Sequence, residues 1–382
     1  MIDISITSSK KGNGFRGIVL LFKVTDSYAN ILKKAFLPES IQPITANNLQ
    51  EAQNALEKEE IDFVITDYES DPGESFKFLS HVKSKYPSIY RMAICNADNQ
   101  KRAIYMVFKG VANSCFEKPH GMVNLMENIN NYIKARDILE SKELLTLVTK
   151  IDNLITLPKT YFEFIEALEE NKSPGEIIKI LEKDISISSK ILQISNSAFY
   201  RANKIGSVEQ AYDYLGPHNI KNIVTIFCYH SEEKLDDVQT EPFDALIAHS
   251  IRVNNEFHSS YQIRAGETLG DSFASIGITH DIGKIIMLKY LPDRFNQVIE
   301  SLRLDPNDDF YTTEIKLGYK RCTHAEIGAY FLKLWNLPDE NVQTALHHHN
   351  YEEAPDDYKK ILKIFKDVNY DMEICEYTKM FT

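Results

Sequence analysis

Histidine and aspartate side chains able to bind a metal recur through the second half of the chain. The sequence contains 11 histidines, and several lie on segments with helical spacing of apolar residues. These side chains are His249, the adjacent pair His280 and Asp281, His324, and the triple His347, His348 and His349. Imidazole and carboxylate groups bind iron, manganese or zinc, and an all-helical frame can direct them to one point. A metal held there would generate a hydroxide able to attack a phosphoester.

A second set of reactive side chains lies in the first third of the chain. Asp26, Asp67, Cys95 and Lys118 each lie at or just past the end of a predicted strand. Ligands of parallel sheets bind at the carboxyl ends of the strands. An acid near a second acid and a lysine can bind a divalent cation such as magnesium and accept a phosphoryl group.

Alternating strands and helices are predicted to position this second set. Short apolar runs at residues 17–22, 63–66, 92–95 and 114–116 predict strands. The segments between them carry apolar residues at helical spacing. Such alternation indicates a parallel sheet.

The remainder of the chain is predicted to be helical. Residues 122–157 contain no glycine or proline and have an apolar stripe, which predicts a connecting helix. Ser173, Pro174 and Glu176 are typical of an N-cap, a first-turn proline and a first-turn acid. No comparable strand run occurs from residue 159 to 300, so we expect a nearly all-α domain or two abutting helical subdomains.

Composition sets limits on the class of protein. The 382 residues indicate two or three domains. The net charge of −12 disfavours a nucleic-acid partner, because phosphate recognition uses a basic surface. The sequence has no run of about 20 apolar residues, so we expect no membrane span. The five cysteines form no CxxC pair, which favours a reducing cytoplasm over a disulfide framework.

The stretch IDFVITDYESDPGESFKFL resembles the phosphoacceptor strand and loop of response-regulator receivers. The resemblance implies a flavodoxin-like, doubly wound parallel sheet at residues 17–135, after an N-terminal extension at 1–16. It makes Asp67 the phosphoacceptor and Lys118, in FEKP, the receiver's lysine. Receivers hold magnesium with a pair of acids after the first strand, whereas KVTDS offers only Asp26. Cys95 replaces the usual serine or threonine, so phosphorylation is left open.

A long helical segment, KILEKDISISSKILQISNSAFYRANKIGSVEQAYDYLG, resembles the signature of HDOD domains, a class within the HD superfamily. The matching positions are Asp184, Asn196, Ser197, Ser207, Val208, Leu215 and Gly216. We expect Asn196 and Ser197 to cap or join helices. The resemblance implies an all-α HDOD domain at residues 158–382, after the connecting helix at 122–157.

The order of the histidines, with ITHDIGK at residues 278–284, resembles the HD superfamily of metal-dependent phosphohydrolases. The resemblance implies six metal ligands: His249, His280, Asp281, His324, His348 and His349. His347 is then the spare member of its triple, and Asp367 is the candidate for the final acid. The segment HHNYEEAPDD lacks the Gly-Tyr-Pro of the cyclic-di-GMP phosphodiesterase branch. HDOD domains are generally regarded as regulatory, so binding is favoured over turnover.

These features predict a bacterial signal-transduction regulator, in which a receiver-like domain controls a non-catalytic HDOD domain. Its partners would be signalling proteins, such as a sensor kinase and a downstream regulator, or a nucleotide second messenger, and the connecting helix is compatible with a homodimer. The alternative is a metal-dependent phosphomono- or phosphodiesterase. DNA binding through residues 173–216 is disfavoured, because no helix there is rich in lysine and arginine. The single tryptophan, Trp335, is expected in a core.

Overall fold

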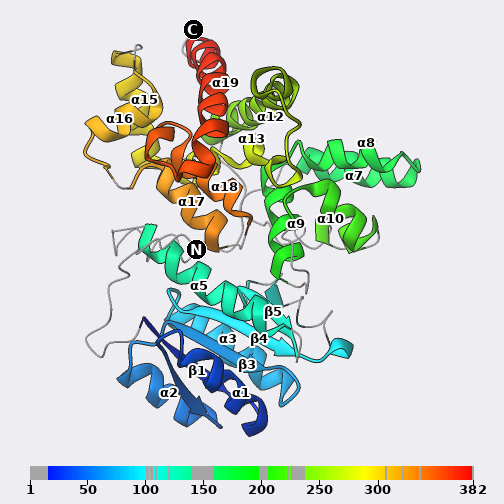
Figure 1. Ribbon diagram of the computed structural model, residues 1–382, viewed down its shortest axis with the longest axis vertical. Coiled ribbons are helices and arrows are strands. Elements are labelled where there is room, and N and C mark those ends of the chain that lie inside the picture. Colours follow the sequence, from blue (N-terminus) through cyan, green and yellow to red (C-terminus); the bar gives the residue numbers. More distant parts are fainter. Residues whose placement is uncertain are drawn as a thin grey trace. The chain divides into compact units, whose positions relative to one another are not determined.

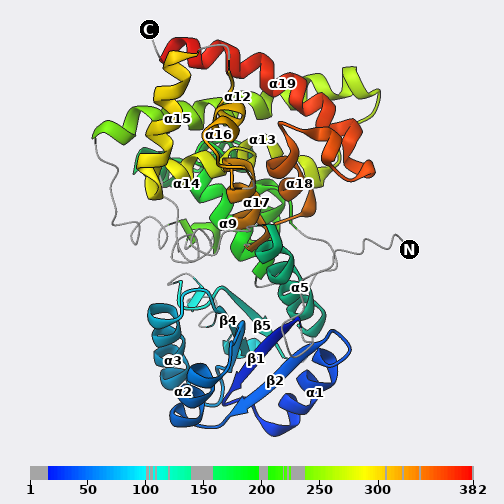
Figure 2. The ribbon, with the colours of Figure 1, turned by 90° about the vertical axis from the view of Figure 1, so that its left-hand side faces the viewer.

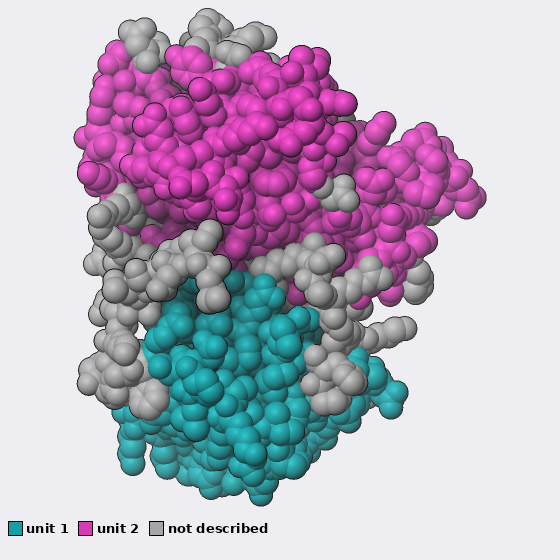
Figure 3. Space-filling view, viewed as in Figure 1, with its two compact units in different colours: residues 1–137, 142–152, 197–202 teal, residues 138–141, 153–196, 203–382 magenta. Residues whose placement is uncertain are grey.

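The structure of the protein is a computed structural model (Figure 1). It describes residues 16–99, 103, 106–107, 110–118, 121–138, 158–197, 205–217, 219–221, 223–224, 237–305, 308–320, 322–334 and 337–380. They form two compact units: described residues up to 137 in the first, and residues 158–196 and 205–380 in the second (Figure 3). The N-terminal extension before Arg16, the second half of the expected connecting helix and Trp335 lie outside the described residues.

The first unit is built on a five-stranded parallel sheet with the order β2-β1-β3-β4-β5. The strands are β1 (Gly17–Phe22), β2 (Ile41–Ala46), β3 (Phe63–Asp67), β4 (Tyr90–Cys95) and β5 (Ser114–Glu117). This is the strand order of flavodoxin-like doubly wound sheets. The predicted fold class of the first unit is therefore confirmed.

Helices cover both faces of this sheet, which explains why its central strands are apolar throughout. They are α1 (Asp26–Phe36), α2 (Leu49–Lys58), α3 (Pro72–Lys85) and α5 (Met122–Ile138). Phe22 contacts Phe78 of α3, with ring centroids 4.0 Å apart. Phe63 meets Tyr132 of α5 at 5.2 Å. Figure 2 shows α2 and α3 on one side of the sheet and α1 and α5 on the other.

Strand β2 was missed by the sequence prediction. It is an edge strand, paired only with β1 among the described strands, and its central residues are partly exposed. Pro43 lies within it, opposite Val19. Edge strands tolerate proline and need no continuous apolar run, because one edge and part of a face contact solvent.

The second unit contains helices and no strand among its described residues, so the predicted all-α class is confirmed. The helices are α7 (Pro158–Glu169), α8 (Pro174–Leu181), α9 (Ile185–Ser197), α10 (Val208–Leu215), α12 (Asp237–Ala265), α13 (Ile276–Thr279), α14 (Ile282–Tyr290), α15 (Pro292–Leu304), α16 (Phe310–Lys316), α17 (His324–Leu334), α18 (Asp339–His347) and α19 (Asp356–Met380). None of the described helices combines the length and apolar character needed to cross a bilayer.

The signature segment behaves as expected from its polar residues. Ser173 and Glu176 form a capping box at the start of α8. The Asp184 carboxylate accepts hydrogen bonds from the backbone N–H groups of Ser186 and Ile187, at the start of α9. At the other end of α9, the Asn196 amide exchanges two hydrogen bonds with the backbone of residue 205. These side chains fix the helix ends, which is a structural role.

A pH-dependent stability is expected from Glu182, which follows α8. Burial, together with the nearby Glu209 carboxylate, raises the pKa of Glu182 to about 7. Because folding raises this pKa, the Glu182 carboxyl group makes its full contribution to the stability of the folded state below about pH 4.5. That contribution is lost as the pH rises through 7. From pH 5 to pH 8, urea unfolding of the parent protein should lose about 2 kcal/mol more than that of Glu182→Gln. Glu300→Gln, at an exposed glutamate of α15, should behave like the parent.

Candidate metal centre

The metal-binding candidates lie on helices that cross closely. His280 and Asp281 form the junction between α13 and α14, and His324 begins α17. A Cβ atom on Gly283 would lie 1.9 Å from the backbone oxygen of His324. Only glycine permits this approach. The contact brings the start of α14 against the start of α17, and therefore Asp281 near His324.

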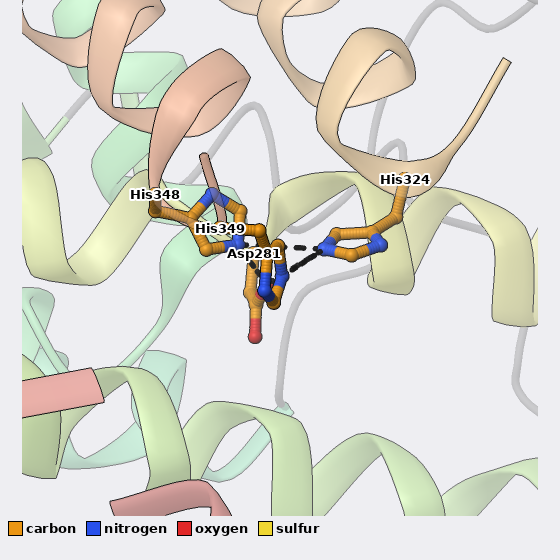
Figure 4. A group of neighbouring side chains, drawn as sticks. All are labelled: Asp281, His324, His348 and His349. Carbon is orange, nitrogen blue, oxygen red and sulfur yellow. Dashed lines mark hydrogen bonds and ion pairs between the residues drawn. The ribbon is translucent and has the colours of Figure 1, made fainter. Parts of the chain in front are cut away.

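The first ligand group comprises Asp281, His324, His348 and His349 (Figure 4). The Asp281 Oδ1 atom lies 3.5 Å from His324 Nε2 and 3.4 Å from His348 Nε2. His324 Nε2 lies 3.4 Å from His348 Nε2 and 3.1 Å from His349 Nε2. All four side chains therefore direct one ligand atom to a shared point.

The second group comprises His249, His280 and Asp281, so Asp281 belongs to both. His249 comes from α12, which lies beside α19 and α13. Its Nε2 atom is 3.6 Å from Asp281 Oδ2, and His280 Nε2 is 3.4 Å from the same oxygen. The structure therefore brings all six predicted ligands to one buried region, on either side of a single carboxylate.

Hydrogen bonds at the opposite ring nitrogens orient three of the histidines. His280 Nδ1 donates to the Gly277 carbonyl at 2.8 Å, and His348 Nδ1 donates to the Ala345 carbonyl at 2.9 Å. His324 Nδ1 lies 2.7 Å from the Glu314 carboxylate. In a neutral imidazole, donation by Nδ1 leaves the lone pair on Nε2. Such second contacts fix the ring for metal binding.

The surroundings of the candidate ligands shift the pKa values of three histidines and of Asp281. Burial lowers the pKa of His324 and His349 well below the ordinary value, and it lowers the pKa of His280. Burial alone would raise the pKa of Asp281. The neighbouring His280 side chain and the Lys284 ammonium, whose Nζ atom lies 2.7 Å from Asp281 Oδ2, outweigh that effect and hold the pKa of Asp281 well below its usual range. Neutral imidazoles beside an ionised carboxylate are the ligand forms of these residues.

The residues fit a divalent transition metal. His280 Nε2 and Asp281 Oδ1 are buried and have no hydrogen-bond partner in the described part of the chain. His348 Nε2 faces Asp281 Oδ1 at 3.4 Å while Nδ1 of the same ring bonds to the Ala345 carbonyl, so these two facing atoms can both bind one cation. Imidazole and carboxylate together suit iron, manganese or zinc.

Three residues of the site were not predicted from the sequence. Lys284 is fully buried, and its Nζ atom lies 2.7 Å from Asp281 Oδ2. Glu314 is buried beside His324 and also accepts from its backbone N–H. Burial raises the pKa of Glu314 to about 8. Asn369 Oδ1 lies 3.0 Å from His249 Nε2. Of these three, Lys284 was the easiest to find from the sequence, because it lies three residues after Asp281 in the motif ITHDIGK.

The prediction of Asp367 as the final metal-binding acid was wrong. Asp367 is exposed on α19, whereas Asn369 is buried on the face that points toward His249. Two residues along a helix turn a side chain by about 200°, so the two positions lie on opposite faces. His347 belongs to neither ligand group among the described residues, as expected for the spare member of the triple.

The receiver-like unit brings together part of its predicted site. Asp67 is fully buried at the end of β3, and both of its carboxylate oxygens lie 2.8 Å from Lys118 Nζ. Cys95 is buried at the end of β4, and burial raises the pKa of its thiol to about 12. Asp26 is exposed at the start of α1. No hydrogen bond or ion pair joins Asp26 to Asp67 within the described residues.

Lysine side chains contribute much of the charge at the end of the sheet where Asp67 lies. No group of three or more metal-binding side chains in the described part of the chain includes Asp67. Lys23 directly follows β1, where receivers carry acids, and its ammonium pairs with Asp71 and Glu74. Two lysines, Lys23 and Lys118, therefore supply positive charge near this end of the sheet.

Comparisons with known proteins agree with the helical unit. The profile of the HDOD domain matches residues 154–351, just over half of the chain. An uncharacterized protein of Treponema pallidum (strain Nichols) is 22% identical over 242 residues, covering 60% of this chain and 44% of that protein. The chain therefore spans less than half the length of this curated relative.

Two solved structures are similar at low sequence identity. The MmoQ response regulator from Methylococcus capsulatus (Bath) has 16% identity and a TM-score of 0.47, covering 58% of this chain and 86% of that one. An HDOD domain protein with unknown function from Geobacter sulfurreducens has 23% identity and a TM-score of 0.33, covering 59% and 76%.

Proposed function

The chain belongs to the HDOD family, and from that premise we propose that it is a bacterial signal-transduction regulator whose HDOD unit binds a divalent transition metal and recognises a signalling partner. The observation that carries the metal proposal is the environment of Asp281. Its carboxylate is 1% exposed, and four histidine Nε2 atoms lie within 3.4–3.6 Å of it.

Burial of the ligands favours regulation over turnover. His249, His280, Asp281, His324 and His348 are all at most 5% exposed, and only His349 reaches the partly exposed class. A hydrolytic metal must admit a water molecule and a phosphoester. A buried metal instead stabilises the helices that hold its ligands, because its binding free energy adds to folding. The folded helical surface then recognises a signalling protein or a nucleotide second messenger.

We propose that the receiver-like unit provides the input through protein contact. Asp67 and Lys118 keep the acceptor-and-lysine pair of a receiver. One of the receiver's two magnesium-binding acids is missing, the remaining acid Asp26 is exposed, and Lys23 directly follows β1. Without a metal to neutralise the developing charge, phosphoryl transfer to Asp67 loses its main electrostatic support. A sensor kinase would then act as a docking partner.

The alternative function is metal-dependent phosphoester hydrolysis. One observation favours it: the two ligand groups share Asp281, and a shared carboxylate can bridge two metals. Two bridged metals can clamp the attacking and leaving oxygens of a phosphoester.

Metal analysis of the purified full-length protein tests the proposal. We expect a bound transition metal in the parent protein, none in His324→Ala, and a normal content in His258→Ala, which changes an exposed histidine of α12. Phosphomono- and phosphodiesterase activity should be absent with manganese, iron or zinc. A parent protein that binds no metal would overturn the metal proposal. Phosphoesterase activity that is present in the parent protein and in His258→Ala but absent in His324→Ala would establish the alternative.

A further inference from the structure

We infer that the HDOD unit holds one ion only, in a closed tetrahedral site of zinc type formed by Asp281, His324, His348 and His349, and that the Lys284 ammonium occupies the second cation position. The inference rests on the proposed metal binding and adds the number of ions, their geometry and the role of Lys284.

The spacing of the first ligand group matches a tetrahedron. Four atoms placed tetrahedrally about 2.0–2.1 Å from an ion lie about 3.3–3.4 Å from one another. The distances that join Asp281 Oδ1, His324 Nε2, His348 Nε2 and His349 Nε2 are 3.1, 3.4, 3.4 and 3.5 Å for four of the six pairs. An ion fits between these atoms with little movement of the side chains.

Four protein ligands leave the ion without an open position. Structural zinc sites are four-coordinate and closed, whereas catalytic zinc keeps a place for water. The supporting contacts are also complete for two of the ligands: Glu314 holds His324, and the Ala345 carbonyl holds His348. Tyr311 stacks on His349, with ring planes 10° apart and centroids at 4.9 Å. These contacts hold three rings in the orientation that the ion needs.

The second cation position is already filled by the protein. Lys284 Nζ lies 2.7 Å from Asp281 Oδ2, the same oxygen that faces His249 and His280. Both the ammonium and the carboxylate are fully buried. A second divalent ion at this oxygen would meet a positive charge in a region of low dielectric constant, where charge repulsion is strong.

The remaining donors of the second position carry no negative charge to compensate. Asn369 offers a neutral amide oxygen 3.0 Å from His249 Nε2, where an acid would attract a cation. His249 and His280 supply imidazole nitrogens and no carboxylate. The Asp281 carboxylate is thus shared between one ion at Oδ1 and the lysine at Oδ2.

Equilibrium dialysis of full-length protein against zinc, with metal content measured per chain, tests this inference. The parent protein should bind one ion tightly. Replacing Lys284 with methionine and Asn369 with aspartate removes the positive charge and adds a negative one, so K284M/N369D should bind two. Replacing Lys289, a lysine of α14 that is not fully buried, with methionine is the matched control and should leave one.

Cobalt substitution provides a second measurement that needs no variant. One cobalt ion per chain should give the intense visible absorption of tetrahedral coordination, and weak octahedral bands would contradict the closed site. Two ions in the parent protein would overturn the role of Lys284 while leaving metal binding intact. One ion in K284M/N369D, with its helical circular dichroism unchanged, would also overturn it. No tight binding of zinc or cobalt would instead defeat the underlying metal proposal.

Discussion

Replacing Gly283 with alanine is expected to lower the free energy of unfolding of the HDOD unit by about 3 kcal/mol and to abolish metal binding. The added methyl group would lie 1.9 Å from the His324 backbone oxygen and 2.9 Å from the Gly328 nitrogen. Backbone atoms cannot rotate away as a side chain can, so α14 and α17 must separate. That separation moves Asp281 away from His324. Urea unfolding and zinc dialysis measure the two effects.

Gly175→Ala is the matched control for this change. Gly175 lies in the first turn of α8, and a Cβ atom there would meet nothing within 4 Å. Alanine favours helix over glycine by about 1 kcal/mol, so this variant should be slightly stabilised. The two variants share one chemical change and should differ in sign. If Gly283→Ala were as stable as the parent protein, the close crossing of α14 and α17 would be incorrect.

Replacing Asp281 with alanine is expected to destabilise the metal-free protein by about 3 kcal/mol or more. The variant keeps the fully buried Lys284 ammonium but removes the carboxylate 2.7 Å from it. Breaking a buried ion pair from one side is costly, because the surviving charge loses its compensation. The measurement is urea unfolding in the presence of a chelator. Metal binding should also be lost, since both ligand groups use Asp281.

The double variant Asp281→Ala/Lys284→Met separates the two causes. It removes both charges and keeps an apolar side chain of similar length, so most of the lost stability should return while metal binding stays absent. Asp367→Ala, at an exposed aspartate of α19, should change stability by less than about 0.5 kcal/mol. A double variant no more stable than Asp281→Ala would show that the Lys284 charge is not the reason for the loss.

The sequence by itself determined the fold class of each unit and the identity of the candidate ligands. Buried strands and amphipathic helices follow from local periodicity, which needs no knowledge of distant contacts. The residue types indicated metal-binding chemistry, and the resemblance of their order to the HD superfamily selected His249, His280, Asp281, His324, His348 and His349. Strand β2 escaped, since an edge strand carries a weaker apolar signal.

Only the tertiary structure decided how these ligands are divided and which other residues join them. Asp281 lies between two histidine groups because α14 crosses α17 at Gly283. Asn369, and not the expected Asp367, is the α19 residue that contacts His249. A helix turns 100° per residue, and packing decides which face of α19 points toward the ligands. The positions of Lys284 against Asp281 and of Lys118 against Asp67 follow from contacts and burial. Charge pairing in a protein interior depends on distances between chain segments, which residue types and spacing do not determine.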